Sequence, residues 1–382
     1  MTRRIAHRAS IPPFIVMDVL RAANERAATG ADVLHLEVGQ PSTGAPARVV
    51  EAARAALGRE VLGYTDALGI PPLRQAIARH YRDRYGVDVD PARIVVTTGS
   101  SGAFILSFLA AFDQGARVAV TAPGYPAYRN ILSALGIEVV EIEVGPQTRF
   151  QPTPALLDKA GKLDGLIVAS PANPTGTMLS AADLKALADH CAKRDIRFIS
   201  DEIYHGITYG DAATTALAVT DRAVVINSFS KYFSMTGWRL GWMVLPEELV
   251  RPVECLAQNL FISPPSLSQV AAVEVFGCRD ELEANVKRYA ANRAVLLDAL
   301  PKAGLDRIAP PDGAFYLYVD VGHVTNDSAD FCKRLLADTG VAITPGMDFD
   351  PSRGSRTLRF SFAGATETME EAARRLGSWL RR

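Results

Sequence analysis

One lysine lies close to two serines and an arginine within residues 228–239. Ser228-Phe-Ser-Lys231 follows an apolar run, and Arg239 comes eight residues after the lysine. A lysine withdrawn from water beside another cation has a lowered pKa, so it can lose its proton and form an imine with a carbonyl compound. The hydroxyl groups and the arginine are suited to hold an anion beside that amine. The combination predicts a cofactor that carries both an aldehyde and a phosphate.

The same stretch has two simpler interpretations. A lysine at a strand-to-helix turn is most often an exposed surface charge. Ser228-x-x-Lys231 also fits the S-x-x-K pattern of penicillin-binding enzymes, in which the serine is the nucleophile. That family also needs a Lys-Thr-Gly element, and the chain contains neither Lys-Thr-Gly nor Lys-Ser-Gly. The stretch alone therefore does not decide between imine chemistry and a surface lysine.

Polar residues that follow other predicted strands favour imine chemistry. Asp201 can accept a hydrogen bond from a protonated ring nitrogen, and Tyr204, three residues later, can bond to a ring oxygen. Asn173 lies in a turn stiffened by two prolines, and Tyr125 in Pro-Gly-Tyr-Pro can present its ring face to a planar ligand. Each residue also has a structural interpretation, as a helix-capping aspartate, a packed tyrosine or an ordinary turn.

Two further segments are suited to bind anions. Thr97-Thr-Gly-Ser-Ser-Gly102 opens a helix, where small residues let backbone N–H groups approach an anion. A tight turn with a serine cap explains the same pattern. The segment is neither a Walker A loop nor a G-x-G-x-x-G fingerprint, so we do not expect a nucleotide. Arg359 alternates with Leu358 and Phe360 on an expected strand, as either a solvated arginine or a bidentate clamp for a substrate carboxylate.

The middle of the chain alternates short β-branched runs with helical patterns. Strands are expected at residues 93–98, 118–122, 166–170, 196–200 and 223–227, and a buried helix at 103–112. Near-continuous apolar strands joined by helices are typical of a mostly parallel sheet covered on both faces. Ligands bind such sheets outside the carboxyl ends of the strands. We therefore expect the candidate residues to meet in one crevice.

The ends of the chain predict a smaller α+β unit. Helical patterns cover residues 282–300, 330–338 and 366–380, and alternating patterns typical of strands cover 313–319 and 356–362. The predicted organisation is a large domain over residues 45–282 and a discontinuous small domain over 1–44 and 283–382.

Composition excludes several classes of partner. The chain has 382 residues, 41 Lys+Arg and 42 Asp+Glu, and a net charge of -1, so we expect neither nucleic acid nor a membrane as a partner. The basic N-terminus is not followed by the apolar run of a secretory signal. Four scattered cysteines without C-x-x-C spacing predict no metal site and favour a cytoplasmic location.

Over nearly its whole length the chain resembles the class I/II aminotransferases, pyridoxal 5′-phosphate enzymes of fold type I. The most specific matches are Asn-Pro-Thr-Gly176, Asp201-x-x-Tyr204, and Ser-x-Ser-Lys231 with Arg239. Gly313-Ala-Phe-Tyr316 and Pro345-Gly-Met-Asp-Phe349 resemble the branch related to bacterial aspartate and aromatic aminotransferases. The resemblance implies an α/β fold with a mostly parallel sheet of the seven-stranded type, covered by helices, and a smaller α+β domain.

The resemblance also implies a cofactor-binding role for each matching residue. Lys231 would form the aldimine with pyridoxal 5′-phosphate and later transfer the substrate proton, while Asp201 would pair with the pyridine nitrogen. Contacts to the cofactor ring are implied for Tyr204, Asn173 and Tyr125. Contacts to the phosphate are implied for Ser100, Ser101, Ser228, Ser230 and Arg239, and for Tyr64 reaching the site of a neighbouring subunit.

The implied substrates are an L-α-amino acid and a 2-oxo acid, exchanged by ping-pong kinetics in a homodimer with a shared active site. The backbone of Gly39, Asn173 and Arg359 would bind the substrate α-carboxylate. Two alternatives remain: a carbon–sulfur β-lyase on the same fold, and the ligand-sensing domain of a transcription regulator. Such regulators carry a DNA-binding domain first, whereas about forty residues without a helix-turn-helix pattern precede Gly39. No motif selects an acidic, aromatic or aliphatic substrate.

Overall fold

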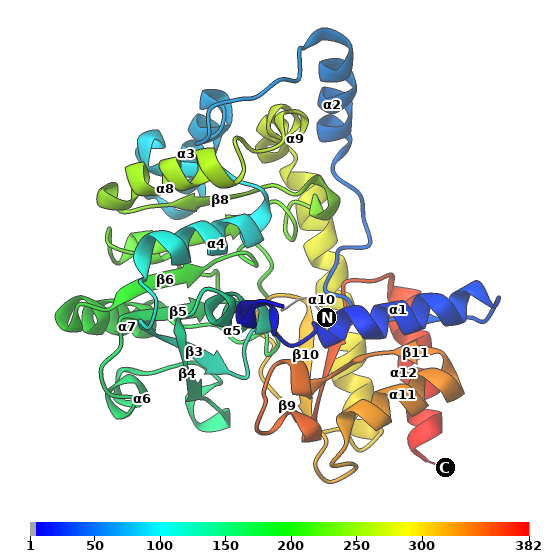
Figure 1. The fold of residues 1–382 in the computed structure, drawn as a ribbon. Helices are drawn as coiled ribbons and strands as arrows, with labels where there is room; N and C mark the ends of the chain where they lie inside the picture. The colour runs from blue at the N-terminus through cyan, green and yellow to red at the C-terminus, as the bar shows by residue number, and fades with distance from the viewer. Residues whose placement is uncertain (1–4, 382) are drawn as a thin grey trace.

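A seven-stranded mixed sheet forms the centre of the larger part of the molecule (Figure 1). The computed structural model describes residues 5–381, so residues 1–4 of the predicted small domain lie outside the described residues. Six of its strands run in the same direction. The seventh, β8, runs antiparallel to both of its neighbours, β2 and β7. The spatial order is β2 (Ile94–Thr97), β8 (Gly241–Val244), β7 (Val224–Ser228), β6 (Arg197–Asp201), β5 (Gly165–Ala169), β3 (Arg117–Ala122) and β4 (Glu138–Glu143). The predicted mostly parallel sheet is confirmed.

Helices cover both faces of this sheet because its strands are apolar on both sides. Along β2, Val95 packs toward one face while Ile94 and Val96 pack toward the other, and β7 alternates in the same way. The helices on the Val95 face are α4 (Gly99–Ala111), α5 (Pro126–Ala134) and α8 (Glu247–Leu260). Those on the opposite face are α3 (Pro71–Tyr85), α6 (Pro154–Lys159) and α7 (Ala181–Arg194).

The N-terminal and C-terminal parts of the chain form two smaller sheets together. β1 (Leu34–His35) pairs in parallel with β11 (Val341–Ala342). The other sheet is antiparallel, in the order β12 (Thr344–Pro345), β13 (Thr357–Ser361), β10 (Tyr316–Asp320) and β9 (Arg307–Ile308). The helices of this part are α1 (Ile15–Ala28), α11 (Ser328–Thr339) and α12 (Thr366–Leu380).

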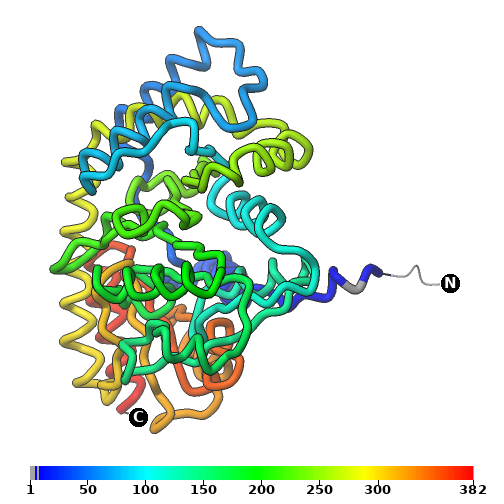
Figure 2. The backbone as a smooth tube through the Cα atoms, turned by 90° about the vertical axis from the view of Figure 1, so that its left-hand side faces the viewer, coloured from blue at the N-terminus to red at the C-terminus, as the bar shows by residue number. Residues whose placement is uncertain are grey.

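One long helix connects the two parts. α10 (Arg279–Lys302) begins near α9 (Ser266–Ala272) and packs against α12, and Figure 2 shows it running along one side of the molecule. α2 (Ala47–Arg59) packs on α9. The predicted domain boundary after residue 282 falls inside the first turn of α10. Among residues 5–381, no helix is long and apolar enough to cross a bilayer.

The expected strands and helices were placed to within a few residues; β4 and β8 of the large sheet were missed, as were the two-residue strands β1, β9, β11 and β12. β4 was missed because three of its six residues are glutamates, and β8 because it is only four residues long. Asp201 and Ser228 are the last residues of β6 and β7, whereas the sequence placed them just after those strands.

Candidate active site

The predicted residues gather at the carboxyl edge of the large sheet. Thr97 at the end of β2 pairs with Gly241, which also pairs with Ser228 at the end of β7. Asp201 at the end of β6 pairs with Ala169 at the end of β5. The last residues of these strands and the turns that follow them carry most of the candidate residues, which therefore share one edge, as expected for an α/β sheet.

Lys231 lies in the turn after β7, with its amine directed toward the N-terminal part of the chain. Its Nζ donates a hydrogen bond of 2.7 Å to the backbone carbonyl oxygen of Gly39 and lies 5.9 Å from the ring centroid of Tyr204. Burial, followed by the positive charges of Arg359 and Arg239, lowers the pKa of Lys231 to about 8. The neutral amine is therefore accessible at mildly alkaline pH, which a nucleophile or proton acceptor requires.

Asp201 is buried, and a neighbouring tyrosine supports its charge. The hydroxyl of Tyr128 donates a short hydrogen bond to Oδ2, and the backbone N–H of Ile203 donates to Oδ1 at 3.1 Å. Burial raises the pKa of Asp201 to about 6, while these two hydrogen bonds and the charge of Lys231 oppose the rise. Tyr125 lies one turn before Tyr128, with the two ring centroids 5.2 Å apart.

A second tyrosine, Tyr316 on β10, joins three parts of the site. Its hydroxyl is 2.7 Å from the hydroxyl of Tyr204. A Cβ atom built on Gly39 would lie 1.6 Å from the same hydroxyl oxygen, so position 39 has no room for a side chain. The ring of Tyr316 also lies 4.4 Å from the guanidinium carbon of Arg359.

Arg359 is buried on β13 and has no carboxylate partner among residues 5–381. One Nη atom donates to Oδ1 of Asn173 at 3.0 Å, and the other donates to the backbone carbonyl of Glu37. The guanidinium group is held between the rings of Tyr316 and Phe349, and its Nε has no hydrogen-bond partner. A fixed, desolvated guanidinium of this kind is suited to bind a carboxylate. The alternative of a solvated arginine is wrong.

The start of α4 and the Arg239 turn form a cradle of small residues and N–H groups. A Cβ atom built on Gly99 would lie 2.4 Å from Nη2 of Arg239, and one on Gly241 would lie 2.8 Å from the backbone nitrogen of Ser100. Ser228, nearby, accepts a hydrogen bond of 3.0 Å at Oγ from the backbone of Ser230. The helix N-terminus and the guanidinium together make the cradle electropositive.

The side chains of two predicted residues are exposed rather than buried in this arrangement. The side chain of Tyr64 is 84% exposed on the loop between α2 and α3. Ser101 is exposed on the first turn of α4. Their predicted roles in a neighbouring subunit's site and in phosphate binding stay predictions.

Sequence reasoning did not assign roles to Tyr128, Tyr316 and Phe349. A signal for Tyr128 was available, because Pro-Gly-Tyr-Pro-Ala-Tyr places it one helical turn after Tyr125. Tyr316 and Phe349 were noted only as part of family-like motifs. Their contacts with Arg359 come from strand pairing between distant segments, which no local pattern reveals.

Comparison with known proteins agrees with this geometry. The family model "Aminotransferase class I and II" matches residues 31–376. The valine–pyruvate aminotransferase of Mycobacterium tuberculosis is 57% identical over 100% of this chain and 99% of its own. The aspartate/prephenate aminotransferase of Thermus thermophilus is 32% identical, with 100% and 99% covered.

Solved structures give the same result. An aminotransferase from Mycobacterium tuberculosis superimposes with a TM-score of 0.98 at 56% identity, covering 100% of both chains. Aspartate aminotransferase from Thermus thermophilus with maleate superimposes with a TM-score of 0.93 at 31% identity, covering 99% of this chain and 100% of that one. The chain belongs to the class I and II aminotransferases and is an enzyme that moves an amino group between an amino acid and a 2-oxo acid.

Proposed function

We propose that this enzyme transfers the amino group of valine, or of a similar aliphatic amino acid, to pyruvate with pyridoxal 5′-phosphate as its cofactor. The whole-chain identity of 57% to a valine–pyruvate aminotransferase supports this choice over the more distant aspartate enzymes at about 30% identity. The observation that carries the proposal is Arg359, a buried guanidinium without a carboxylate partner among residues 5–381, close to an amine of lowered pKa.

The residues present fit this cofactor group by group. The Lys231 amine suits an aldehyde, and the Asp201 carboxylate suits a protonated pyridine nitrogen. The cradle that a Cβ at Gly99 would fill suits a phosphate, with Arg239, Ser100 and Ser228 as its donors and Ser230 and Ser101 beside them. Tyr125 and Tyr204 would contact the ring together with Asn173. Once bound, pyridoxal phosphate supplies an aldehyde for the amino group and a ring that withdraws electrons from Cα.

The protein's own contribution begins with proton transfer. Among these groups only Lys231 carries an amine. In its neutral form this amine can accept the Cα proton of the substrate and then donate the proton to another atom. Its hydrogen bond to the carbonyl of Gly39 shows that the free amine reaches the segment proposed to bind the substrate carboxylate. Asp201 keeps a negative charge where it would face the pyridine nitrogen, because Tyr128 and the N–H of Ile203 offset the cost of burying it.

Substrate orientation would come from Arg359 and Asn173. Their mutual hydrogen bond and the stacking of Tyr316 and Phe349 fix the guanidinium before substrate arrives. Substrate binding would therefore cost little side-chain conformational entropy at Arg359. The backbone of Gly39 would complete the carboxylate site. The ring centroid of Phe14 is 5.9 Å from that of Tyr125, and an apolar ring beside the proposed substrate site would favour an aliphatic over an acidic side chain.

We further infer a homodimer with a shared active site, and a division into domains near α10. Apolar and aromatic side chains exposed along the α2–α3 loop and around the end of α8 support an interface there: Val61, Leu62, Tyr64, Leu260 and Ile262. Tyr64 would reach the cradle of the second subunit. Four cysteines without a disulfide support a cytoplasmic location.

A panel of amino acids mixed with the holoenzyme tests the proposal. Valine should bleach the visible absorption of the bound cofactor at a lower concentration than aspartate or phenylalanine, and alanine should form only when pyruvate is added. The Lys231→Ala variant should lose steady turnover while retaining its circular dichroism spectrum. Ammonia released without any 2-oxo acid would instead indicate a lyase, and equal bleaching by aspartate would contradict the aliphatic preference.

A further inference from the structure

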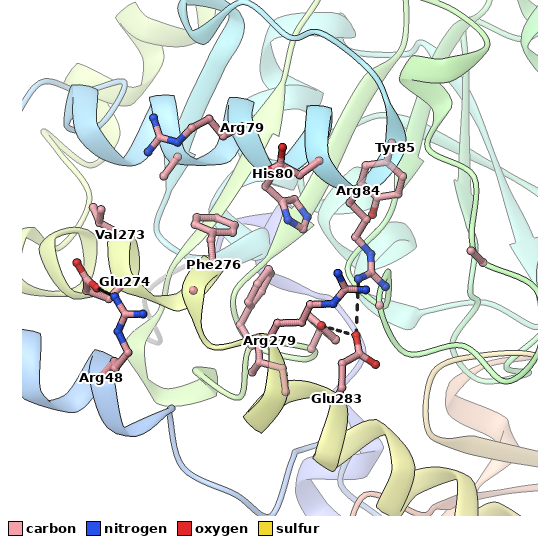
Figure 3. A pocket seen from close by; sticks show the side chains of 18 of the residues that line it. Arg48, Arg79, His80, Arg84, Tyr85, Val273, Glu274, Phe276, Arg279 and Glu283 are labelled. Carbon is pink, nitrogen blue, oxygen red and sulfur yellow. Dashed lines mark hydrogen bonds and ion pairs between the residues drawn. The ribbon is translucent and has the colours of Figure 1, made fainter.

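A large cavity lies behind the Lys231 turn and does not include the candidate active-site residues. It has a volume of about 790 Å³ and is formed by α3, the segment before α10, the start of α10 and the turn that follows Lys231 (Figure 3). Tyr232 and Phe233, the two residues after Lys231, are part of its wall. The cavity and the active site are therefore separated by one short stretch of backbone.

The cavity wall carries more positive than negative charge. Four arginines line it, against three carboxylates: Arg48, Arg79, Arg84 and Arg279, and Asp83, Glu274 and Glu283. Arg48 is paired with Glu274, whereas neither Arg79 nor Arg279 forms an ion pair or a hydrogen bond with another described residue. An unpaired guanidinium at the wall of a cavity is a ready donor to an anion.

The excess of positive charge is concentrated around Glu283. This carboxylate accepts a hydrogen bond of 2.7 Å from the hydroxyl of Tyr232 and is 3.7 Å from Arg84. Burial raises the pKa of Tyr232, and the hydrogen bond to Glu283 and its negative charge raise it further. The positive charges of Arg84 and Arg279 oppose this rise, so both guanidinium groups lie near the hydroxyl. Among the described residues only Arg84 is within ion-pair distance of Glu283, so the nearby Arg279 leaves about one positive charge for a ligand.

The opposite wall of the cavity is aromatic. The ring of His80 lies 5.2 Å from that of Phe276, and Phe276 lies 5.4 Å from Phe233. Burial and the charge of Arg84 lower the pKa of His80 to about 4, so this ring is neutral at physiological pH. A single excess charge beside an apolar wall favours a monoanion with an apolar body over a dianionic phosphate.

Two connections lead from the cavity wall to the active site. Tyr232 is covalently adjacent to Lys231. In addition, the hydroxyl of Tyr85 donates to Nδ1 of His205 at 2.9 Å, and Nε2 of His205 donates to the carbonyl of Ser170 at 3.0 Å. Ser170 begins the loop that carries Asn173. We propose that this cavity binds a small monocarboxylate with an apolar body and that its occupancy changes the turnover rate of the enzyme.

Soaking holoenzyme crystals with 4-bromobenzoate tests the site directly, since bromine is located by its anomalous scattering. We expect a bromine peak in the cavity, near Arg279. In the Arg279→Met variant the affinity should fall about tenfold, as for the loss of one charge-assisted contact. Arg54→Met is the matched control, because Arg54 is exposed on α2 outside the cavity and its loss changes the net charge equally.

Kinetics separate this site from competition at Arg359. With saturating valine and pyruvate, 4-bromobenzoate should change kcat at least twofold in the wild type and in Arg54→Met, but not in Arg279→Met. Competition at the active site would raise KM and leave kcat unchanged. Arg79→Gln, on a different helix, should weaken the effect if Arg279→Met fails to fold. Bromine at Arg359 only, or nowhere, would refute the site, and bromine in the cavity with constant kcat would refute its effect on turnover.

Discussion

Removal of the Tyr128 hydroxyl should shift the pH dependence of catalysis. This hydroxyl donates to Oδ2 of Asp201, a carboxylate whose pKa is already raised to about 6 by burial. A hydrogen bond to a charged group is worth about 1.5–3 kcal/mol. Since one pKa unit corresponds to about 1.4 kcal/mol, Tyr128→Phe should raise the pKa of Asp201 by about one to two units.

Activity should fall at neutral pH, because the proposed role of Asp201 requires its ionised form. At pH 7 the ionised fraction of Asp201 should fall from about nine-tenths to between about one half and one tenth. A positively charged ring nitrogen of the cofactor would lower both pKa values, so the difference between the two enzymes is the quantity to measure. The acidic limb of the kcat/KM profile should move upward by about one to two pH units, with activity recovered at higher pH.

The assay is a pH profile of kcat/KM from pH 5 to 9 for the wild type, Tyr128→Phe and Tyr318→Phe. Tyr318 is the matched control, because its buried hydroxyl bonds to Thr357 on the small sheet, away from Asp201. Superimposable profiles for the wild type and Tyr128→Phe would refute the role given to this hydrogen bond. An equal shift in Tyr318→Phe would show that the effect is not specific to Asp201.

Three other predictions concern the remaining parts of the site. Arg359→Lys should raise KM for the amino acid at least about tenfold with a smaller loss in kcat, because lysine cannot reproduce the bidentate geometry; an unchanged KM would argue against a carboxylate clamp. Gly99→Ala should weaken cofactor binding about tenfold or more in titrations of the apoenzyme, through contact with Arg239. Gly86→Ala has a similar positive φ but open space around it, so it should affect stability only. Burial raises the pKa of Glu202 to about 7, so the native state holds an extra proton and stability should fall as pH rises from about 4.5 to 7. Glu202→Gln should flatten that dependence in melting temperatures measured at pH 5 and 8, and an unchanged slope would count against this explanation.

The sequence predicted those parts of the site in which each residue follows its own strand. Asp201, Ser228 and Lys231 come at or just after buried apolar strands, and parallel strands bring their carboxyl ends to one edge whatever the details of the loops. The order of strands could not be read in this way. The antiparallel β8, between β2 and β7, brings Gly241 against Ser100, a contact that depends on pairing between distant segments.

The environment of Arg359 was the least predictable feature. Alternation along the strand predicts that its side chain points away from those of Leu358 and Phe360, but both faces of β13 are buried, so the pattern could not tell a solvated arginine from a clamp. Its partners come from four separate segments, at Glu37, Asn173, Tyr316 and Phe349. Only the tertiary packing of the small sheet against the N-terminal segment and against the loop after β5 brings these segments together.

Tyr316 contacts several of the segments that form the candidate site. Its hydroxyl contacts the hydroxyl of Tyr204 on the large-sheet side and occupies the space that a side chain at Gly39 would need. The carbonyl of Gly39 accepts the hydrogen bond from Lys231, and the ring of Tyr316 stacks on Arg359. A shift of β10 would therefore disturb both the Gly39 segment that accepts the Lys231 hydrogen bond and the guanidinium proposed to bind the substrate carboxylate. Tyr316 contacts both the segment that accepts the Lys231 hydrogen bond and the Arg359 guanidinium, and a fixed spacing of these two groups is what presenting the Cα–H bond of a substrate to the amine would require.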